Sequence, residues 1–598
     1  MLRAAVIKRA FMPRFARHHA SSSSEFADLT TNLTYVNDEE EAYTRASTNM
    51  KKFLPPLRTG KKGIDLIHDP LFNKGTGYKH AERDRLGLRG LVPPRRLNMK
   101  LQLEKLYSLY QEEENPLRKN IFLSELQNRN ETLFFRLLID YIEEMGTPVV
   151  NGMGIPIGKL ALYTAAGGID PRKVLPVVLD LGTNNETYLK DPYYLGMQHR
   201  RLEGEAFYSV VDEFMRAVRH RWPKALVQFE DFSRAFPIPS AKSSRVLTIP
   251  YNNMMMMGCS DHAADVLHAY RLKQLCFNDD IQGTGATVLA GALSACLRVN
   301  TPLKEQRILV LGAGSAGLGV STTLLQGMLQ EGAKLDDARK RFYVFDQFGL
   351  LGESRTELTS GQQFFARPDL TDKTSLLDVI KQVKPTMILG LSAARGAFTE
   401  ECIREMAKHV EMPIVFPLSN PTSVAECTAQ QAYDWTDGRV VFASGSPFAP
   451  VTYNGHEYVV SQCNNMFIFP GVGLGAVVCG ATRVTDRMLY VAAQALATCM
   501  TPEEIAKGQV FPSVKQIRKV SLKVRLTASC VVDMQTRTAV HGWRTNVWLW
   551  RSIVATAVVQ CAVDDGLALS PPVLRKGANL EEFVASKMYL PIYRALVE

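Results

Sequence analysis

The sequence lacks three features that would define its class at once: a long apolar run, paired cysteines and a charge spread over the whole chain. No apolar stretch in its 598 residues reaches the ~18 needed to span a bilayer. The ten cysteines show no C-x-x-C spacing, which favours unbridged thiols in a reducing compartment. A hydrophobic fraction of 46% excludes wholesale disorder and predicts a soluble protein of several domains, with no membrane segment.

Acidic residues are scarce in three short segments, and these segments account for the net charge of +10. Residues 1–24 contribute +5, and residues 234–259 and 524–553 contribute +3 each, so the rest of the chain is close to neutral. A nucleic-acid groove would require a basic face built into the fold. The charge distribution therefore predicts that nucleic acid is not a partner.

The N-terminus has the composition of a targeting segment. Arg and Lys are mixed with apolar residues, four serines follow at 21–24, and the first acid is Glu25. An Arg-rich, Ser-rich and acid-poor start is typical of mitochondrial transit peptides. We therefore predict a transit peptide at 1–24 and a location in the mitochondrial matrix, an ordinary basic tail being the alternative.

A glycine-rich turn stands between a predicted buried strand at 308–311 and a helix-like segment. Its glycines have the G-x-G-x-x-G spacing: Gly312, Gly314 and Gly317. The first permits a tight turn, the second lets backbone approach a pyrophosphate, and the third allows close packing of helix on strand. A strand at 342–345 then ends in Asp346, which would bind the adenosine ribose and repel a 2′-phosphate. This favours NAD over NADP, unless Asp346 only begins a loop.

Further strand candidates are separated by helix-sized segments. They lie at 387–389, 414–416 and 440–442. This alternation predicts an α/β fold with a Rossmann-type, doubly wound parallel sheet that binds NAD.

Two pairs of adjacent acids precede the glycine-rich turn. Glu230 and Asp231 follow a strand-like run at 225–228, and Asp279 and Asp280 follow Asn278. Converging carboxylates bind a hard divalent cation, Mg²⁺ or Mn²⁺, through oxygen. The alternative is that such pairs are helix caps and solvated turns, with Asp279 and Asp280 capping a helix that begins near residue 281.

Several segments together resemble the malic enzymes, over about residues 60–572. These are RLGLRG at 85–90, GMGIPIGK at 152–159, FEDF at 229–232, FNDDIQGT at 277–284, SNPT at 419–422, FASGSP at 442–447, and NN at 464–465 followed by FPGV at 469–472. The resemblance implies oxidative decarboxylation of L-malate to pyruvate and CO₂ with reduction of NAD. It also implies a dimer or tetramer of identical chains.

The resemblance implies roles for individual residues. Lys159 would take the C2 hydroxyl proton as general base, supported by Asp279. The ligands of Mg²⁺ or Mn²⁺ would be Glu230, Asp231 and Asp280. The substrate carboxylate would be oriented by Asn420, which also lies at the cofactor, and by one of Asn464 and Asn465.

The family fold implies an order of domains. A helical N-terminal region at 25–144 comes first, and a tail at 573–598 comes last. Between them a substrate and metal domain, split into 145–277 and 466–572, encloses the NAD-binding domain at 278–465.

The chain departs from the family pattern in three places. Residues 142–150 run directly into Asn151, so a Tyr-Thr-Pro-Thr-Val-Gly segment is missing near 145–151, together with the tyrosine that acts as general acid. Residues 234–259 and 524–553 are apparent insertions, the second within what should be one helix. Translated introns and a skipped exon would explain all three, with lineage-specific loops as the alternative. A catalytically dead NAD-binding protein is accordingly the alternative to an active enzyme.

Overall fold

The computed structural model describes residues 55–145, 154–230, 253–256, 263–372, 374–513, 553–574 and 579–597. The chain divides into two compact units. The described part of the smaller unit is a two-stranded parallel sheet, β1 (Leu57–Arg58) with β14 (Leu596–Val597). The larger unit contains everything discussed below. The predicted transit peptide lies outside the described residues.

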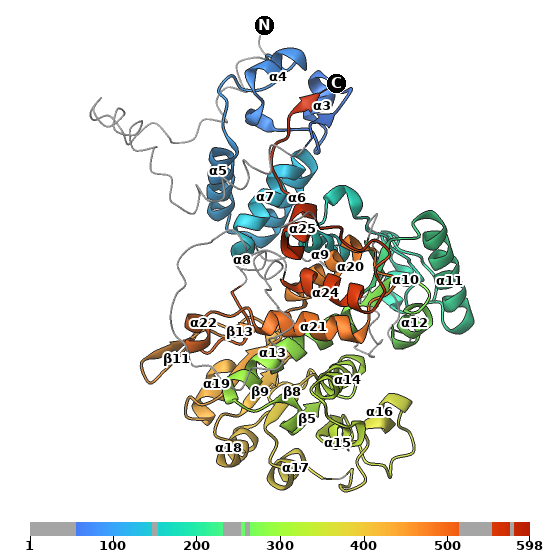
Figure 1. The fold of residues 1–598 in the computed structure, drawn as a ribbon, viewed down its shortest axis with the longest axis vertical. Helices are drawn as coiled ribbons and strands as arrows, with labels where there is room; N and C mark the ends of the chain where they lie inside the picture. The colour runs from blue at the N-terminus through green and yellow to red at the C-terminus, as the bar shows by residue number, and fades with distance from the viewer. Residues whose placement is uncertain are drawn as a thin grey trace. The chain divides into compact units, whose positions relative to one another are not determined.

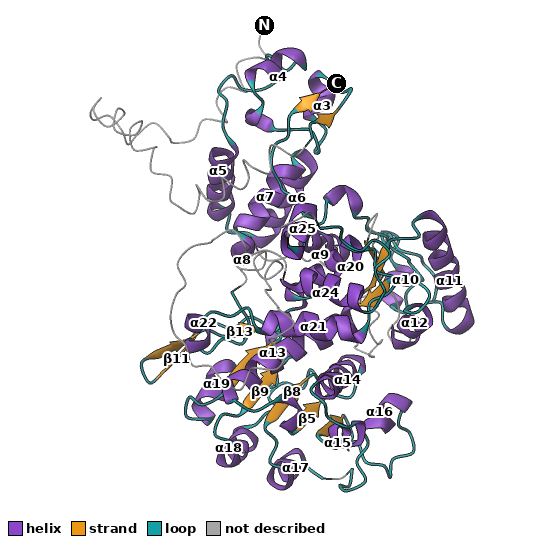
Figure 2. Cartoon of the chain, viewed as in Figure 1, coloured by secondary structure: helices purple, strands orange, loops and turns teal. Residues whose placement is uncertain are grey.

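A seven-stranded sheet is the largest in the structure (Figure 2). Its strands, in spatial order, are β13 (Ser461–Gln462), β10 (Val441–Ser444), β9 (Ile414–Pro417), β8 (Met387–Gly390), β5 (Ile308–Leu311), β6 (Phe342–Asp346) and β7 (Gly349–Leu350). All neighbours are parallel except β6 and β7. After β5, the chain adds β6 and β7 on one side of it, and then returns to add β8, β9, β10 and β13 in turn on the other side. The predicted doubly wound parallel sheet is therefore confirmed.

Side chains on the central strands alternate between two buried cores, because successive residues of a strand face opposite sides of the sheet. One core includes Val310, Leu389 and Phe416. The helices that share it are α13 (Thr284–Val299), α14 (Ser315–Gln330) and α21 (Asp486–Ala497). The opposite core includes Leu309, Ile388 and Val415. The helices on that side are α17 (Leu376–Val383), α18 (Glu400–His409) and α19 (Ala429–Trp435) (Figure 1).

A second, smaller sheet is entirely parallel and has the order β3-β2-β4. Its strands are β2 (Leu226–Phe229), β3 (Asn253–Met256) and β4 (Cys276–Asn278). The surrounding helices include α11 (Gly204–Arg221) and α12 (Ala263–Tyr270). Part of the apparent insertion at 234–259 forms β3, because the backbone of this stretch pairs with the open edge of β2. Backbone pairing requires no amphipathic period, which is why the run of methionines did not indicate it.

Residues 63–145 are mainly helical. The helices are α3 (Gly63–Ile67), α4 (His80–Arg85), α5 (Met99–Glu112), α6 (Pro116–Arg129), α7 (Glu131–Asp140) and α8 (Ile142–Met145). Asparagine side chains cap the N-termini of α5, α6 and α7, and each accepts a backbone hydrogen bond in the first turn. The buried faces of α5, α6 and α7 form a separate core, which α9 (Gly154–Ala165) joins through Ala161 and Ala165.

Residues near the C-terminus return to the principal core. Helix α24 (Ile553–Asp564) packs on α20 (Phe469–Val478) and on α21. Gly471 allows this contact, because a Cβ there would lie 2.6 Å from Val554 Cβ. Helix α25 (Leu580–Lys587) contacts α24. The remaining short helices are α10 (Glu186–Lys190), α15 (Leu335–Arg339), α16 (Ser360–Phe365) and α22 (Pro502–Ala506), and a hairpin joins β11 (Val451–Tyr453) to β12 (His456–Tyr458).

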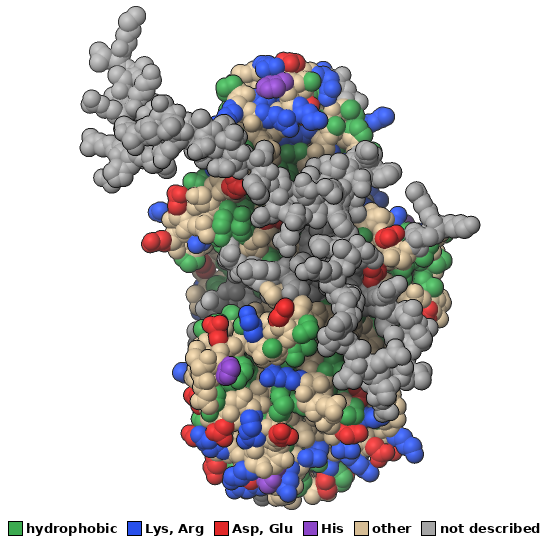
Figure 3. Space-filling model, turned by 60° about the vertical axis from the view of Figure 1, so that its left-hand side comes forward, with side chains coloured by type: hydrophobic (Ala, Val, Ile, Leu, Met, Phe, Trp, Pro, Cys, Tyr) green, Lys and Arg blue, Asp and Glu red, His purple; other side chains and the backbone are tan. Residues whose placement is uncertain are grey.

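In the described part of the chain, no helix is long and apolar enough to cross a membrane. Basic and acidic side chains are interspersed over the lower half of the face drawn in Figure 3, whereas Lys and Arg predominate at its upper end. This mixture agrees with the nearly neutral charge of the chain outside its three basic segments.

Candidate functional site

Helix α9 presents Lys159 beside α20. The helix is apolar and mostly buried, including Gly158 and Leu160 on either side of Lys159. The Lys159 ammonium lies 5.0 Å from the centre of the Phe469 ring, and its side chain is only 19% exposed. A lysine in such surroundings needs anionic partners, because burial of an unpaired charge is strongly unfavourable.

Two buried carboxylates supply that partnership. Glu230 directly follows β2 and Asp279 directly follows β4, so parallel pairing of these strands brings both acids to the same edge of the smaller sheet. Lys159 Nζ lies 2.6 Å from Glu230 Oε1 and is also in contact with Asp279 Oδ2. The Asp279 side chain is fully buried and that of Glu230 is 6% exposed. We call Lys159, Glu230 and Asp279 the lysine–carboxylate cluster.

Neutral side chains hold the carboxylates from behind. Tyr163, one helical turn after Lys159, donates a hydrogen bond to Gln228 Oε1. Gln228 Nε2 in turn donates to Glu230 Oε2 at 2.9 Å. On the other side, Asn465 Nδ2 donates to Asp279 Oδ2 at 3.2 Å and to Thr284 Oγ1 at 3.0 Å. The cluster is thus connected to α9, β2, the start of α13 and the segment before α20.

The cluster has strongly perturbed electrostatics. Burial by itself lowers the pKa of Lys159, but the nearby carboxylates of Asp279, Glu230 and Asp280 outweigh it and raise that pKa above the ordinary value. Burial raises the pKa of Glu230 well above its usual range, although Lys159 opposes this. Burial also raises the pKa of Tyr163. In this arrangement Lys159 carries a proton.

The donor set fits a hard divalent cation. Oxygen is the ligand atom that Mg²⁺ and Mn²⁺ prefer, and Asp279 Oδ1 is buried without a hydrogen-bond partner among the described residues. The same part of the chain contains no group of three acidic, histidine or cysteine side chains close enough to hold an ion. Asp231 lies outside the described residues, and Asp280 lies in the turn after β4. The metal ligands Glu230, Asp231 and Asp280 stay a prediction.

A single π-helical turn, Asp279–Gly283, connects β4 to α13. Its cap is Asn278, whose side chain accepts a hydrogen bond from Ile281 N at 2.9 Å, so neither aspartate serves as the helix cap. Gly283 is required next to Asp279, because a Cβ there would lie 1.8 Å from Asp279 Oδ1. The turn packs on α14 through Ile281 and Gly319, and the lysine–carboxylate cluster therefore lies near the helix that follows the glycine-rich turn.

The glycine-rich turn joins β5 to α14. Gly312 has φ +123°, a conformation that L side chains rarely adopt. A Cβ on Gly317 would lie 1.8 Å from Gly312 O, so only glycine allows the helix this close to the turn. A Cβ on Gly314, by contrast, would meet no atom within 4 Å. The first turn of α14 therefore exposes backbone N–H groups next to open space, where an anion can approach.

Asp346, at the end of β6, is held by a partner that the sequence did not indicate. Arg355 places its guanidinium against both carboxylate oxygens, at 2.9 and 2.7 Å. Burial alone would raise the pKa of Asp346, but the hydrogen bonds from Arg355 and from Phe348 N lower it. The predicted role of Asp346 at the ribose stays a prediction.

The asparagines differ in their surroundings. Asn420 precedes a cis proline, and its Oδ1 accepts a hydrogen bond from Ser446 Oγ at 3.1 Å. Asn464 Oδ1 accepts from Met466 N at 3.0 Å and caps a short turn before α20. Of Asn464 and Asn465, only Asn465 contacts the lysine–carboxylate cluster. Their predicted substrate contacts are untested.

Sequence reasoning missed three residues that organise the lysine–carboxylate cluster and the end of β6: Tyr163, Gln228 and Arg355. Tyr163 has a signal, because it lies four residues after Lys159 and so on the same face of a helix. Gln228 alternates with Glu230 along an extended strand, which also places the two on one face. Arg355 has no signal of this kind, since it reaches Asp346 from a loop.

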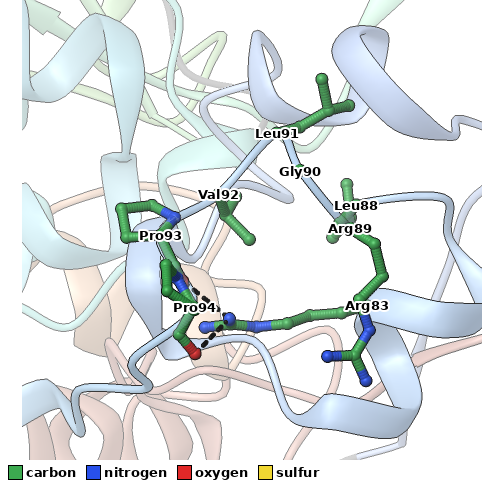
Figure 4. Close-up of a pocket in the computed structure, with 8 residues that line it drawn as sticks. All are labelled: Arg83, Leu88, Arg89, Gly90, Leu91, Val92, Pro93 and Pro94. Atoms are coloured by element: carbon green, nitrogen blue, oxygen red, sulfur yellow. Dashed lines mark hydrogen bonds between the residues drawn. The ribbon is translucent and has the colours of Figure 1, made fainter.

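A surface hollow lies elsewhere, in residues 83–94 (Figure 4). Arg83 is 1% exposed there and donates hydrogen bonds to the carbonyls of Pro93 (2.7 Å) and Pro94 (2.9 Å). These bonds fix the loop that follows the RLGLRG segment. None of the predicted site residues comes from this segment.

The sheet and the glycine-rich turn define an α/β protein with a Rossmann-type fold. The sequence matches the family models "Malic enzyme, N-terminal domain" over residues 142–240 and "Malic enzyme, NAD binding domain" over residues 281–532. The chain belongs to the malic enzyme family.

Relatives with established names match most of the chain. An NADP-dependent malic enzyme of Dictyostelium discoideum is 39% identical, over 88% of this chain and 98% of its own length. A hydrogenosomal malic enzyme of Neocallimastix frontalis is 40% identical, over 79% and 87%. An NAD-dependent malic enzyme of Aliivibrio fischeri is 38% identical, over 78% and 91%.

Among solved structures, the Entamoeba histolytica malic enzyme superposes with a TM-score of 0.48 at 20% identity, over 73% of this chain and 69% of that one. The family assignment therefore rests on the sequence matches. The alignment with the Dictyostelium protein extends over 592 positions yet takes in only 88% of the 598 residues here. Some positions of that relative consequently have no counterpart in this chain.

Proposed function

We propose that this protein oxidatively decarboxylates L-malate to pyruvate and CO₂ and reduces NAD, with Mg²⁺ or Mn²⁺ as a required ion. The observation that carries the proposal is the lysine–carboxylate cluster next to a dinucleotide-type fold. A buried lysine that is ion-paired with two carboxylates is an ionisable group placed for proton transfer, unlike a lysine on the surface.

The residues divide the work as follows. When bound, the divalent cation supplies a Lewis acid that withdraws electrons from the oxygens of a 2-hydroxy acid. Glu230 and Asp280, with Asp231, would hold it. Lys159 Nζ, once deprotonated, accepts the proton of the C2 hydroxyl, and Asp279 orients Nζ and shares its charge.

A proton balance supports this assignment. Two of the three carboxylates that raise the pKa of Lys159, Glu230 and Asp280, are those that would face the cation. Neutralising these two removes part of the attraction that raises the pKa of Lys159, while the burial that lowers it is unchanged. Asn465 keeps Asp279 in place throughout, because its amide also bonds to Thr284.

NAD is the proposed cofactor in preference to NADP, because a carboxylate at the end of β6 disfavours a 2′-phosphate. Both cofactors occur among the named relatives. The ratio of kcat/KM for NAD to that for NADP tests this preference. A ratio below one would reassign the cofactor and leave the reaction class intact.

The decisive experiment measures NADH formation from L-malate with Mn²⁺, alongside NAD binding by calorimetry. Turnover that disappears in Asp279→Asn, with NAD binding retained, is the expected result. Binding without any turnover by the unmodified chain would instead identify a catalytically dead NAD-binding protein, the alternative that the missing tyrosine segment suggests.

The cell biology follows the same proposal. A homo-oligomer, a dimer or tetramer, in the mitochondrial matrix is the expected form. Light scattering on the purified protein measures the molar mass of the oligomer. A fluorescent fusion with and without residues 1–24 tests whether this segment directs the protein to mitochondria. The hydrogenosomal relative supports an organellar location.

A further inference from the structure

Glu426 is a buried carboxylate to which the proposed reaction assigns no task. It is 0% exposed and lies after the loop that follows β9. Its Oε1 accepts three hydrogen bonds, from Ser392 N and Ser392 Oγ at 3.1 Å each and from Ser419 Oγ at 2.5 Å. These donors come from the loops that follow β8 and β9, so one oxygen atom ties two neighbouring loops together.

The hydrogen bonds continue to a strained residue. Ser419 Oγ also accepts a hydrogen bond from Ala393 N at 2.8 Å. Ala393 has φ +54°, in the left-handed region that is unfavourable for a residue with a Cβ atom. The amides of Ser392 and Ala393 are therefore both fixed by Glu426, the first directly and the second through Ser419. This is the kind of support that a left-handed alanine requires.

The strained residue lies opposite the glycine-rich turn. A Cβ on Gly312 would lie 2.4 Å from Leu391 O and 3.0 Å from Ser392 N, so the two loops are in direct contact. β5 and β8 are also adjacent strands, and the strand order reverses between them, so they form the topological switch point of the sheet. Ligands of open α/β sheets bind in the crevice outside the carboxyl ends of such a pair of strands.

Glu426 also fills the space above β8. A Cβ on Gly390 would lie 2.4 Å from Glu426 Cδ, which leaves that carboxylate no room to move toward the sheet. Its second oxygen, Oε2, is buried without a hydrogen-bond partner among the described residues. The carboxylate is thus held through Oε1 alone, and loss of that oxygen would release both loops.

We propose that Glu426 is a positioning residue for the dinucleotide. Through Ser392 and Ser419 it keeps Ala393 in its left-handed conformation, and this conformation sets the wall of the crevice that faces the glycine-rich turn. The proposal rests on the proposed function, since it requires that NAD binds at this edge of the sheet.

The first test compares Glu426→Ala and Glu426→Gln with the unmodified full-length protein, using NAD binding by calorimetry. We expect the NAD Kd to rise about tenfold in E426A, which loses all three hydrogen bonds to Oε1, and less in E426Q, which keeps a neutral acceptor. Glu504 provides a matched control. It is 8% exposed and accepts backbone hydrogen bonds from Thr501 and Ser513, so E504Q should lower Tm and leave the NAD Kd unchanged.

The second test asks whether Glu426 affects NAD binding through the left-handed conformation of Ala393. Glycine adopts positive φ at no steric expense. Ala393→Gly should therefore return the NAD Kd of E426A to within about threefold of the original value, whereas a purely structural Glu426 would allow no such rescue. The same substitution in E426Q carries the test if E426A does not fold.

The outcomes separate the two proposals. An unmodified chain that binds NAD, with an unchanged Kd in E426A or with no rescue by A393G, overturns the role of Glu426 and leaves the proposed function standing. An unmodified chain that binds no NAD overturns both.

Discussion

The glycine-rich turn and the lysine–carboxylate cluster are built from residues at very different separations along the chain. Gly312, Gly314 and Gly317 lie within six consecutive residues, and their geometry follows from one strand, one turn and one helix. Lys159 and Asp279 are 120 residues apart and meet only after α9, β2, β4 and α20 have packed.

The two regions therefore differ in how they respond to changes elsewhere in the chain. Changes in the glycine-rich turn act through local backbone geometry, whereas the cluster depends on every element that carries a member. The stretch between β2 and β4 includes the apparent insertion at 234–259, and the segment before α9 includes the apparent gap near 145–151. None of the three departures falls within the strand, turn and helix that form the glycine-rich turn, whereas two of them border elements that carry the cluster.

The strongest test of this comparison is Lys159→Ala. Removal of a general base should reduce kcat for malate oxidation about 10²- to 10⁴-fold, because proton transfer contributes that much. The NAD Kd, measured by calorimetry, should change less than about twofold. Lys173→Ala, at an exposed lysine in the same larger unit, is the control and should leave kcat unaltered. A fall in NAD affinity equal to the fall in kcat would show that the two regions are not separable.

The converse test changes the glycine-rich turn alone. Gly314→Ala meets open space and should leave Tm unchanged, while the added methyl should raise the NAD Kd about 10- to 100-fold by displacing an anion from backbone N–H donors. Gly312→Ala should lower Tm as well, because its Cβ would lie 2.4 Å from Leu391 O. Equal Kd values for G314A and the unmodified protein would mean that no pyrophosphate approaches there.

Tyr163→Phe sharpens the comparison on the cluster side. The substitution removes the hydrogen bond to Gln228, which orients the amide that holds Glu230. Groups that orient metal ligands typically change affinity by ~10- to 100-fold, and we expect about tenfold weaker Mn²⁺ binding by electron paramagnetic resonance. Tyr433→Phe, at another buried tyrosine, should not affect it. Unchanged Mn²⁺ affinity in Y163F would contradict an ion at Glu230.

The smallest expected effect concerns the Arg355–Asp346 pair. The pKa of Asp346 is lowered in the folded state. The pair therefore contributes stability above the unfolded pKa of ~3.9, and this contribution is lost as pH falls through the folded pKa. Arg355→Met should therefore cost about 1 kcal/mol near pH 7, and the difference should shrink as pH falls below about 4 toward the lowered pKa of Asp346. Denaturation midpoints across this range measure it. The exposed Arg404–Glu400 pair is the control, and R404M should leave the denaturation midpoints unchanged across the same pH range.

Much of the architecture could be predicted because it is periodic and local. The apolar runs at 308–311 and 414–416 are strands in the structure, and Gly312 occupies the positive-φ position of the turn that its spacing indicated. The motifs also identified the family, because each combines several residue types at fixed spacing. Strand β3 escaped prediction, since an edge strand follows from an available partner rather than from its own pattern.

The sequence by itself determined the fold class, the position of the glycine-rich turn and the family, because strand periods, glycine conformations and motif spacings are properties of neighbouring residues. Tertiary structure alone decided that Lys159 shares Glu230 and Asp279, that Arg355 takes both oxygens of Asp346, and that Glu426 supports a strained Ala393. Each of these arrangements joins charged or strained groups from different elements. Their partners are selected by the energy of burying such groups, which only the assembled fold determines.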